Sequence, residues 1–375
     1  MKLFFAGDFC SRPSASLISV SEDLKRLIRS CTIRVVNFEV PLKPEGAEVP
    51  KGRERLWQND DTPDFLRGIG FNCFSLANNH AFDWGEEGYL KTRSALGEDC
   101  FGAGTYEEAY RIKVVEVENV KIGFLGVTFA AYTGVFDDVM NHDGLGCAYV
   151  NDFRVSHAIH DAKKKVDYLF VLPHDGIEYI DIPLPETVAR YRDFIDWGAD
   201  GVIASHPHCP QGWEVYDGKP IFYSLGNFFF NSKSTPSYQA DLPHWYEGLC
   251  VVIELQDGAV SFEVYNTKNA GNVSISLDDD PARDGHNAFL RHLLEDREEY
   301  LGQLRRYCAS QGRKEMGIID RTIHPHSLKA STRQVLKLWI QKLNGSAKTN
   351  DYPLKRLLTH DARRSLLLWT IRLKK

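Results

Sequence analysis

The stretch "GADGVIASHPHCPQGWEVYDGKPIFYSLGNF", residues 198–228, combines a buried strand, a pair of histidines and a hairpin. Residues 200–205 form a short apolar run that is typical of a buried strand. His206 and His208 follow it directly, and an Asp-Gly pair then separates two strand-like runs, which predicts a hairpin. The two histidines are either metal ligands held at the end of a strand or ordinary polar residues.

Short apolar runs alternate with helical patterns over most of the 375 residues, which is typical of a layered α/β fold. We expect strands at residues 2–7, 33–40, 71–77, 112–118, 121–127, 167–173 and 200–205. Apolar residues spaced three and four apart predict helices at residues 85–98, 151–165 and 185–198. A second Asp-Gly hairpin within residues 250–265 indicates that the sheet becomes antiparallel after residue 205.

The composition changes near residue 280, where we place the boundary between a domain of residues 1–280 and a helical extension of residues 281–375. Within the extension we expect helices at residues 285–309, 327–343 and 352–371. The last one is basic and amphipathic. It either packs on the core or lies at the surface in contact with a membrane or a partner protein.

The bulk composition excludes several classes of protein. A net charge of −6 argues against a general nucleic-acid-binding surface. No run approaches the roughly 18 to 20 apolar residues of a membrane-spanning helix, and residues 1–10 lack the apolar core of a signal peptide. The 8 cysteines are scattered without a C-x-x-C pair, which favours reduced, mostly buried thiols. We therefore expect a cytoplasmic protein that binds no nucleic acid.

Potential metal ligands stand at the ends of five predicted strands. Alone, each side chain has a structural explanation as a turn residue, a helix cap or a solvated group. Together they predict a ligand set along one edge of the sheet, where α/β proteins open their binding sites. Their mixed oxygen and nitrogen atoms suit Mn, Fe or Zn, and the set is large enough for two such ions bridged by a carboxylate. The six residues are Asp8, Glu39, Asn79, His174, His206 and His208.

His80 stands beside this set without being needed as a ligand. If two metals activate water for attack on phosphorus, the leaving oxygen needs a proton, which His80 can supply while Asp83 orients its ring. The alternative is that His80 only caps the helix that follows. Gln211 and Asn227 are candidate substrate contacts, although Gly226 and Asn227 can equally form a plain turn.

The blocks "GDF", "NFEVPL", "LANNHAFDWGEEGY" and "HDGIEY", followed by residues 198–228, resemble the CapA family of poly-γ-glutamate capsule synthesis proteins over about residues 1–270. That family is similar to the calcineurin-like metallophosphoesterases. The resemblance implies a four-layer α/β/β/α sandwich of two mixed sheets, with a C-terminal helical extension outside it. It also implies that the six ligands form a dinuclear metal site, that His80 is the acid, and that Glu178 lies beside the ligands and faces the substrate.

One position departs from the metallophosphoesterase pattern. The first motif of those enzymes is generally Asp-x-His. The corresponding motif of this chain begins at Asp8, and its third residue is Cys10. Cys10 is either a thiolate ligand or a buried, inert thiol, and the departure predicts that one of the two metal positions is weakly held or empty.

These observations lead to three functional hypotheses. The first is a metal-dependent phosphomonoesterase or phosphodiesterase that acts on a phosphorylated or anionic small molecule in capsule or other cell-surface polymer metabolism. The second is hydrolysis or transfer of a γ-glutamyl amide at the same metals. The third is a non-enzymatic accessory subunit, whose basic C-terminal helix contacts membrane partners of a capsule-synthesis complex and makes the protein peripheral to the membrane.

Overall fold

The computed structural model describes residues 1–46, 55–130, 134–136, 144–232, 242, 244–271, 273–309 and 368–369. The chain forms two compact units, residues 1–296 and residues 297–375. The first unit contains both large sheets. In the second unit the structure describes α9 (Arg297–Tyr307). The helices expected at residues 327–343 and 352–371 lie outside the described residues, apart from Leu368 and Trp369.

The first sheet contains the N-terminal strand of the chain. Its strand order is β2-β17-β16-β15-β1-β3-β4-β5, and β14 also pairs with β1. Strand β1 runs parallel to β3 and β14 and antiparallel to β15. The strands are β1 (Lys2–Ser11), β2 (Ser19–Val20), β3 (Ile33–Phe38), β4 (Cys73–Ser75), β5 (Cys100–Phe101), β14 (Asn227–Asn231), β15 (Glu247–Gln256), β16 (Ala259–Ala270) and β17 (Ser274–Leu277).

The second sheet has the order β12-β13-β11-β10-β8-β7. Its strands are β7 (Lys113–Val117), β8 (Val120–Thr128), β10 (Tyr168–His174), β11 (Gly201–Ile203), β12 (Trp213–Tyr216) and β13 (Lys219–Phe222). A small separate pair joins β6 (Ala103–Gly104) to β9 (Gly146–Cys147). All seven predicted strands and both Asp-Gly hairpins are therefore present. The chain after residue 205 is not wholly antiparallel, because β13 joins β11 in parallel.

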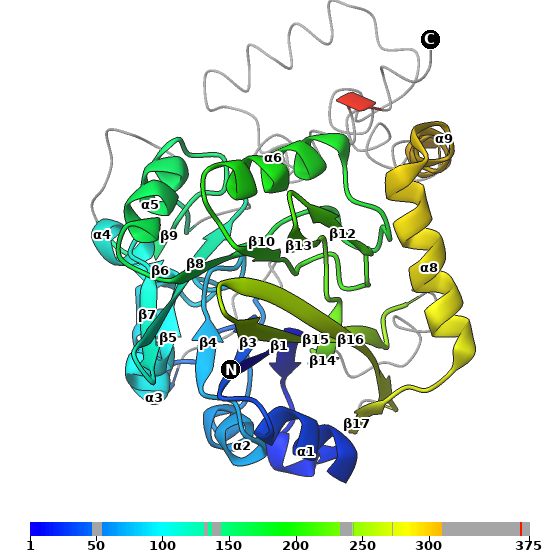
Figure 1. Cartoon of the computed structure of the whole chain (residues 1–375). Coiled ribbons are helices and arrows are strands. Elements are labelled where there is room, and N and C mark those ends of the chain that lie inside the picture. Colours follow the sequence, from blue (N-terminus) through cyan, green and yellow to red (C-terminus); the bar gives the residue numbers. More distant parts are fainter. Residues whose placement is uncertain are drawn as a thin grey trace, which may run out of the picture. The chain divides into compact units, whose positions relative to one another are not determined.

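The two sheets face each other across an apolar core, and helices cover their outer faces (Figure 1). Alternation along β1 shows how the sequence produces these layers: Leu3 and Phe5 point into the core between the sheets, whereas Phe4 points to the helices. Helices α1 (Glu22–Arg29), α2 (Thr62–Ile69) and α3 (Gly85–Leu96) cover the first sheet, and α5 (Arg154–Lys163) and α6 (Pro185–Asp196) cover the second. This is the four-layer α/β/β/α sandwich that the family resemblance implied.

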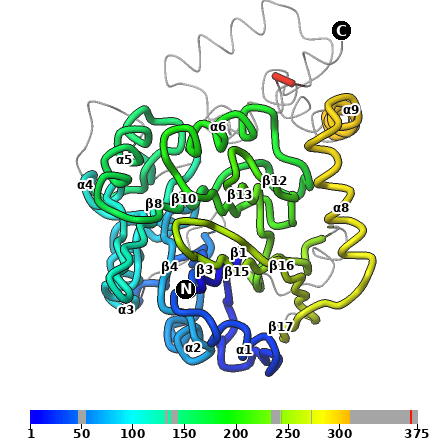
Figure 2. Tube along the Cα trace, in the orientation of Figure 1, coloured from blue at the N-terminus to red at the C-terminus, as the bar shows by residue number. Residues whose placement is uncertain are grey.

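Segments that are far apart in the sequence lie side by side in the first sheet. Figure 2 shows the blue N-terminal strand β1 beside the yellow-green β15, and the two pair from Lys2 opposite Glu254 to Ala6 opposite Cys250. Short α4 (Tyr106–Ala109) and two 3-10 turns, Ala15–Leu17 and Gly97–Asp99, complete the connections.

Helix α8 (Pro281–Glu295) belongs to the first unit, although the sequence analysis places residues 281–375 together in the extension. Its contacts explain the difference. Leu290 and Leu293 are buried, the Asn287 side chain donates to Asn266 Oδ1 at 2.7 Å, and the Arg291 guanidinium lies 5.0 Å from the ring centre of Trp213. Within the described residues, no helix combines the length and the apolar character that crossing a bilayer requires.

Candidate metal centre

The six predicted ligands meet where strands of the two sheets end. Asp8 lies near the end of β1, and Glu39 and Asn79 follow β3 and β4 of the same sheet. The other three come from the second sheet: His174 ends β10, and His206 and His208 follow β11. All six side chains are buried. The ligands therefore do not line one edge of a single sheet as expected, because the facing of two sheets brings them together.

Asn37 links the two carboxylates. Its Nδ2 donates to Asp8 Oδ1 at 2.7 Å and to Glu39 Oε2 at 2.8 Å, and it lies 3.1 Å from His174 Nδ1. The backbone N–H of His206 donates to the other Asp8 oxygen at 3.1 Å. Asn37 is not among the residues predicted from the sequence. Asn37 stands two residues before Glu39, a spacing that places residues of a strand on one face, but this periodicity does not show which side chains will meet.

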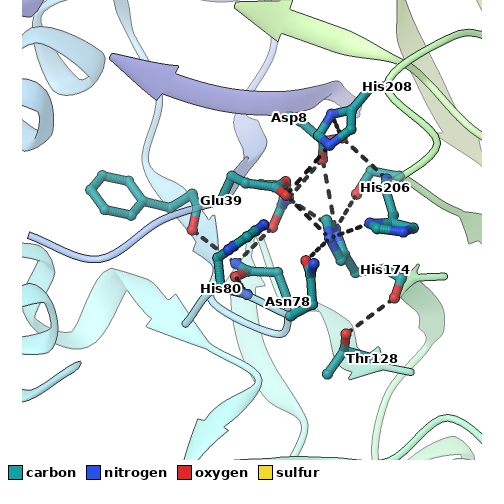
Figure 3. Close-up of polar contacts among 12 residues, drawn as sticks. Asp8, Glu39, Asn78, His80, Thr128, His174, His206 and His208 are labelled. Carbon is teal, nitrogen blue, oxygen red and sulfur yellow. Dashed lines mark hydrogen bonds and ion pairs between the residues drawn. The ribbon is translucent and has the colours of Figure 1, made fainter. Parts of the chain in front are cut away.

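The histidines surround Glu39 (Figure 3). His174 Nε2 lies 3.4 Å from Glu39 Oε1 and 2.8 Å from Asn79 Oδ1. His208 Nε2 lies 4.0 Å from the same Glu39 oxygen. Two sets of potential ligand atoms result, each within 4.8 Å of one another: Asp8 with Glu39 and His174, and Glu39 with His206 and His208. Glu39 belongs to both sets, so its carboxylate could serve two ions if both were bound.

The chemistry of these side chains fits bound cations. Glu39 Oε1 is buried without a hydrogen-bond partner among the described residues, a costly state for a carboxylate oxygen in a protein interior. Burial, and then the charge of Asp8, raises the pKa of Glu39 well above its usual value. Burial lowers the pKa of His174 to about 4 against the opposing charge of Asp8, so its ring is neutral at pH 7, the form that binds metals.

The backbone at His206 and His208 adopts an unusual conformation. Their φ angles are +105° and +58°, in the left-handed region that residues other than glycine seldom occupy. Asn227 Oδ1 lies 2.9 Å from His208 Nδ1, which fixes the proton on that nitrogen and turns Nε2 toward Glu39. Strain of this kind collects at functional sites, where the surrounding structure holds it in place.

His80 and Asp83 form a pair beside the ligands. His80 Nδ1 lies 2.9 Å from Asp83 Oδ2, which also accepts the backbone N–H of Leu56 at 2.9 Å. Burial lowers the pKa of His80, but the charge of Asp83 and its hydrogen bond outweigh that effect and raise the pKa to about 9. The His80 side chain is 16% exposed and makes no capping bond to α3, so the helix-cap alternative has no support in the structure.

The predicted substrate contacts lie at different depths. Asn227 and Gln211 are buried: Asn227 Nδ2 donates to the Trp245 carbonyl at 3.0 Å, and Gln211 Nε2 donates to the carbonyls of Ile180 at 2.7 Å and Ile182 at 3.1 Å. Glu178 is half-buried, and its charge raises the pKa of His80. Contact of these three residues with substrate stays a prediction.

Cys10 is a buried thiol in an apolar cluster with Val40, Phe230 and Trp245. Burial, and then the charge of Glu39, raises the pKa of Cys10 well above its usual value. The protonated, packed form is therefore favoured over a thiolate ligand. The same cluster encloses His208, whose ring centre lies 4.8 Å from that of Phe230 and 5.2 Å from that of Trp245.

Two facing sheets between helices, with carboxylates and imidazoles buried where strands of both sheets end, define a four-layer α/β protein with a candidate metal centre. A family model of the bacterial capsule synthesis protein PGA_cap matches residues 2–232, and the chain belongs to this family.

Several known proteins are similar to this chain. The capsule biosynthesis protein CapA of Bacillus anthracis is 30% identical over 221 residues, covering 56% of this chain and 53% of CapA. The PGA biosynthesis protein CapA of Bacillus subtilis (strain 168) is 30% identical over 234 residues, covering 61% of each. A probable polyglutamine synthesis accessory protein of Mycobacterium tuberculosis is 27% identical over 205 residues, covering 52% of this chain and 54% of that protein. The chain thus spans between half and two thirds of the length of these relatives.

Among solved structures, a phosphatase from Mycoplasma pneumoniae aligns with a TM-score of 0.45 and 14% identity, covering 71% of this chain and 92% of the phosphatase.

Proposed function

We propose that this protein is a metal-dependent hydrolase of the phosphomonoesterase or phosphodiesterase type, acting in the metabolism of a capsule or another cell-surface polymer, such as poly-γ-glutamate or a polysaccharide. The observation that carries the proposal is the pair of ligand sets that share Glu39. Membership of the capsule synthesis family supports the link to polymer metabolism.

The residues that would hold two divalent ions of Mn, Fe or Zn are Asp8, Glu39, Asn79, His174, His206 and His208. When bound, such ions activate water and neutralise the charge that develops on a phosphoryl group. Around them, Asn37 orients both carboxylates through its 2.7 and 2.8 Å bonds, and Asn227 orients His208 through its 2.9 Å bond. Support of this kind fixes ligand geometry before substrate arrives.

His80 is the proposed general acid. Asp83 holds its Nδ1 at 2.9 Å, so Nε2 is the nitrogen that can carry a proton to the leaving oxygen. The His80 side chain is 16% exposed, so solvent reaches its ring. A phosphorylated or anionic small molecule related to the polymer would place its leaving group there.

The test combines metal analysis with turnover. Protein purified in Mn-containing buffer is assayed for bound metal and then with a panel of phosphate monoesters, phosphate diesters and γ-glutamyl amides. We expect up to two metals per centre and turnover of a phosphate ester, with kcat reduced about 10²- to 10⁴-fold in His80→Gln. His157→Ala, an exposed histidine of α5, is the control and keeps full turnover. A metal-loaded protein that turns over nothing in the panel contradicts the hydrolase proposal, and turnover of the amides alone assigns the γ-glutamyl chemistry.

The name of the Mycobacterium tuberculosis relative favours a second candidate, an accessory subunit of a polymer-synthesis complex. In this case the centre would serve folding or the binding of an anionic chain. Residues 352–375 would contact membrane partners, and the protein would lie in the cytoplasm at the membrane surface. Full polymer synthesis by a His206→Ala/His208→Ala variant, with co-purification of membrane enzymes that requires residues 352–375, would establish this role. Loss of synthesis in that variant, with co-purification intact, would exclude it.

A further inference from the structure

A second group of potential ligands lies outside the candidate centre and shares no residue with it. Asp181, His244 and His286 place one nitrogen or oxygen atom each within 4.8 Å of one another. Asp181 lies between β10 and α6, His244 precedes β15, and His286 lies in α8. Three segments that are distant in the sequence therefore meet at this group.

His286 supplies a ring nitrogen that the protein does not satisfy. His286 Nε2 is buried and has no hydrogen-bond partner among the described residues. Asp181 Oδ2 lies 3.7 Å from this nitrogen, too far for a hydrogen bond. Ligand atoms 2.0–2.1 Å from a tetrahedral zinc ion lie about 3.4 Å apart, so this separation is close to that of two atoms sharing an ion.

Glu247 orients the ring of His244. Its Nδ1 lies 2.8 Å from Glu247 Oε2, and Arg283 pairs with the other oxygen of Glu247. A carboxylate at one ring nitrogen leaves the other, Nε2, to face an ion, which is the usual support of a metal-binding histidine. His244 also has a φ of +64°, a strained conformation for a residue other than glycine.

We propose that Asp181, His244 and His286 form a mononuclear site for a divalent transition-metal ion of the zinc type. Two imidazoles and one carboxylate give three protein ligands and leave a fourth position for water or another ligand. The imidazole rings now lie 4.3 Å apart and nearly parallel, at 8°. Because an ion lies near the plane of each ring that binds it, binding tilts the rings apart. The ion joins α8 to the loops before α6 and β15.

The proposal is independent of the hydrolase function, and its test does not use activity. Full-length protein is stripped with chelator and titrated with Co²⁺, and bound metal is counted while the visible absorption bands of Co²⁺ are recorded. The key comparison uses the His206→Ala/His208→Ala background. There we expect one Co²⁺ to bind at this site, and adding either His286→Ala or Asp181→Asn to remove it, with a loss of affinity of at least 100-fold. Adding His157→Ala, an exposed histidine of α5, leaves it bound.

Far-ultraviolet circular dichroism of every variant checks the fold. Two variants at different segments keep the test valid if one of them fails to fold. An unchanged number of bound ions after both Asp181→Asn and His286→Ala, or no binding in the His206→Ala/His208→Ala background at millimolar Co²⁺, overturns the proposal.

Discussion

His206 and His208 have a strained backbone conformation beside the candidate metal centre. Both hold positive φ angles, +105° and +58°, although neither is a glycine. A strained backbone conformation of this kind costs on the order of 1–3 kcal/mol. The conformation turns the His206 N–H toward Asp8, at 3.1 Å from its Oδ2, while both rings join the ligand set.

The strain at His206 leads to a prediction about stability without metal. Glycine adopts a positive φ without strain, whereas alanine does not. Metal-free His206→Gly should therefore have a free energy of unfolding about 1 kcal/mol higher than that of His206→Ala. Urea unfolding of the chelated proteins measures the difference. The matched pair is His157→Gly and His157→Ala in the middle of α5, where glycine should be the less stable by about 1 kcal/mol. If glycine were less stable than alanine at position 206 as well as at position 157, the φ of His206 would store no strain.

Asn37 leads to a prediction about affinity. It donates to Asp8 and Glu39 without belonging to either ligand set, so Asn37→Ala should weaken binding of Mn²⁺ or Zn²⁺ by about 10- to 100-fold through loss of orientation. Isothermal titration of chelated protein measures the affinity. Asn72→Ala is the control, because the hydrogen bonds that the Asn72 side chain makes with described residues go to backbone groups of Arg34 and Thr32. Unchanged affinity in Asn37→Ala would mean that the carboxylates hold their positions without it.

The candidate ligands and the residues that support them differ in how far the sequence predicts them. All six candidate ligands could be named from the sequence because each stands at a predicted strand end, and the structure brings their side chains together. Their supports could not be assigned in the same way: Asn37 lies inside a strand, and Asn227, predicted as a substrate contact, lies 2.9 Å from His208 Nδ1. The contacts between these polar side chains depend on how the two sheets pack. Strand periodicity does not contain that information.

Among the secondary-structure elements, turn residues predicted the two hairpins correctly, whereas the ends of one predicted helix were wrong. Asp217-Gly218 and Asp257-Gly258 both adopt positive φ angles, as the predicted two-residue hairpins require. The helix expected over residues 285–309 is instead two helices, α8 and α9. The break falls at Asp296, whose φ and ψ of −100° and 100° are extended. Asp296 stands between Glu295 and Arg297, so neither glycine nor proline marks the break in the sequence.

The short helix α4 leads to a prediction about pH. Thr105 and Glu108 form a reciprocal capping box at its start, and Arg93 donates to Glu108 Oε1 at 2.9 Å. The hydrogen bond from Arg93, and then that from the Thr105 backbone, lowers the pKa of Glu108 from 4.5 to about 2. Because the folded pKa is below the unfolded one, this contribution to stability is complete above pH 4.5 and disappears as the pH falls toward 2.

Glu108→Gln should therefore lower the free energy of unfolding by about 1 kcal/mol at pH 7, a value reduced for the partial exposure of the pair. The difference from the wild type should shrink as the pH falls below 4.5. Urea unfolding at a series of pH values measures it. Glu107→Gln, at the exposed neighbouring position, is the control and should change stability little. A difference that is independent of pH would show that the capping geometry, and not the charge, is what Glu108 contributes.

At the scale of the whole molecule, the site exists because two sheets face each other. Asp8 and Glu39 come from the first sheet and His174, His206 and His208 from the second. The sequence alone suggested a line of ligands on one sheet edge. It could not show that β1 and β10 belong to different sheets, because strand order in a sheet is set by long-range pairing, such as that of β1 with β15 across more than 240 residues. The resemblance to a known family supplied the two-sheet arrangement.

Because its ligands come from both sheets, the centre should couple metal binding to global stability. An ion that binds only the folded chain stabilises it by about 2.7 kcal/mol at a free concentration of 100 times Kd, so saturating Mn²⁺ or Zn²⁺ should raise Tm by several degrees over chelated protein. Mg²⁺ should raise it less, since imidazole nitrogens are poor ligands for that ion. Differential scanning calorimetry measures the shifts. The His206→Ala/His208→Ala variant should lose most of the Mn²⁺ shift. An equal Mn²⁺ shift in that variant and in the wild type would place the stabilising ion elsewhere and remove the physical basis for a centre between the sheets.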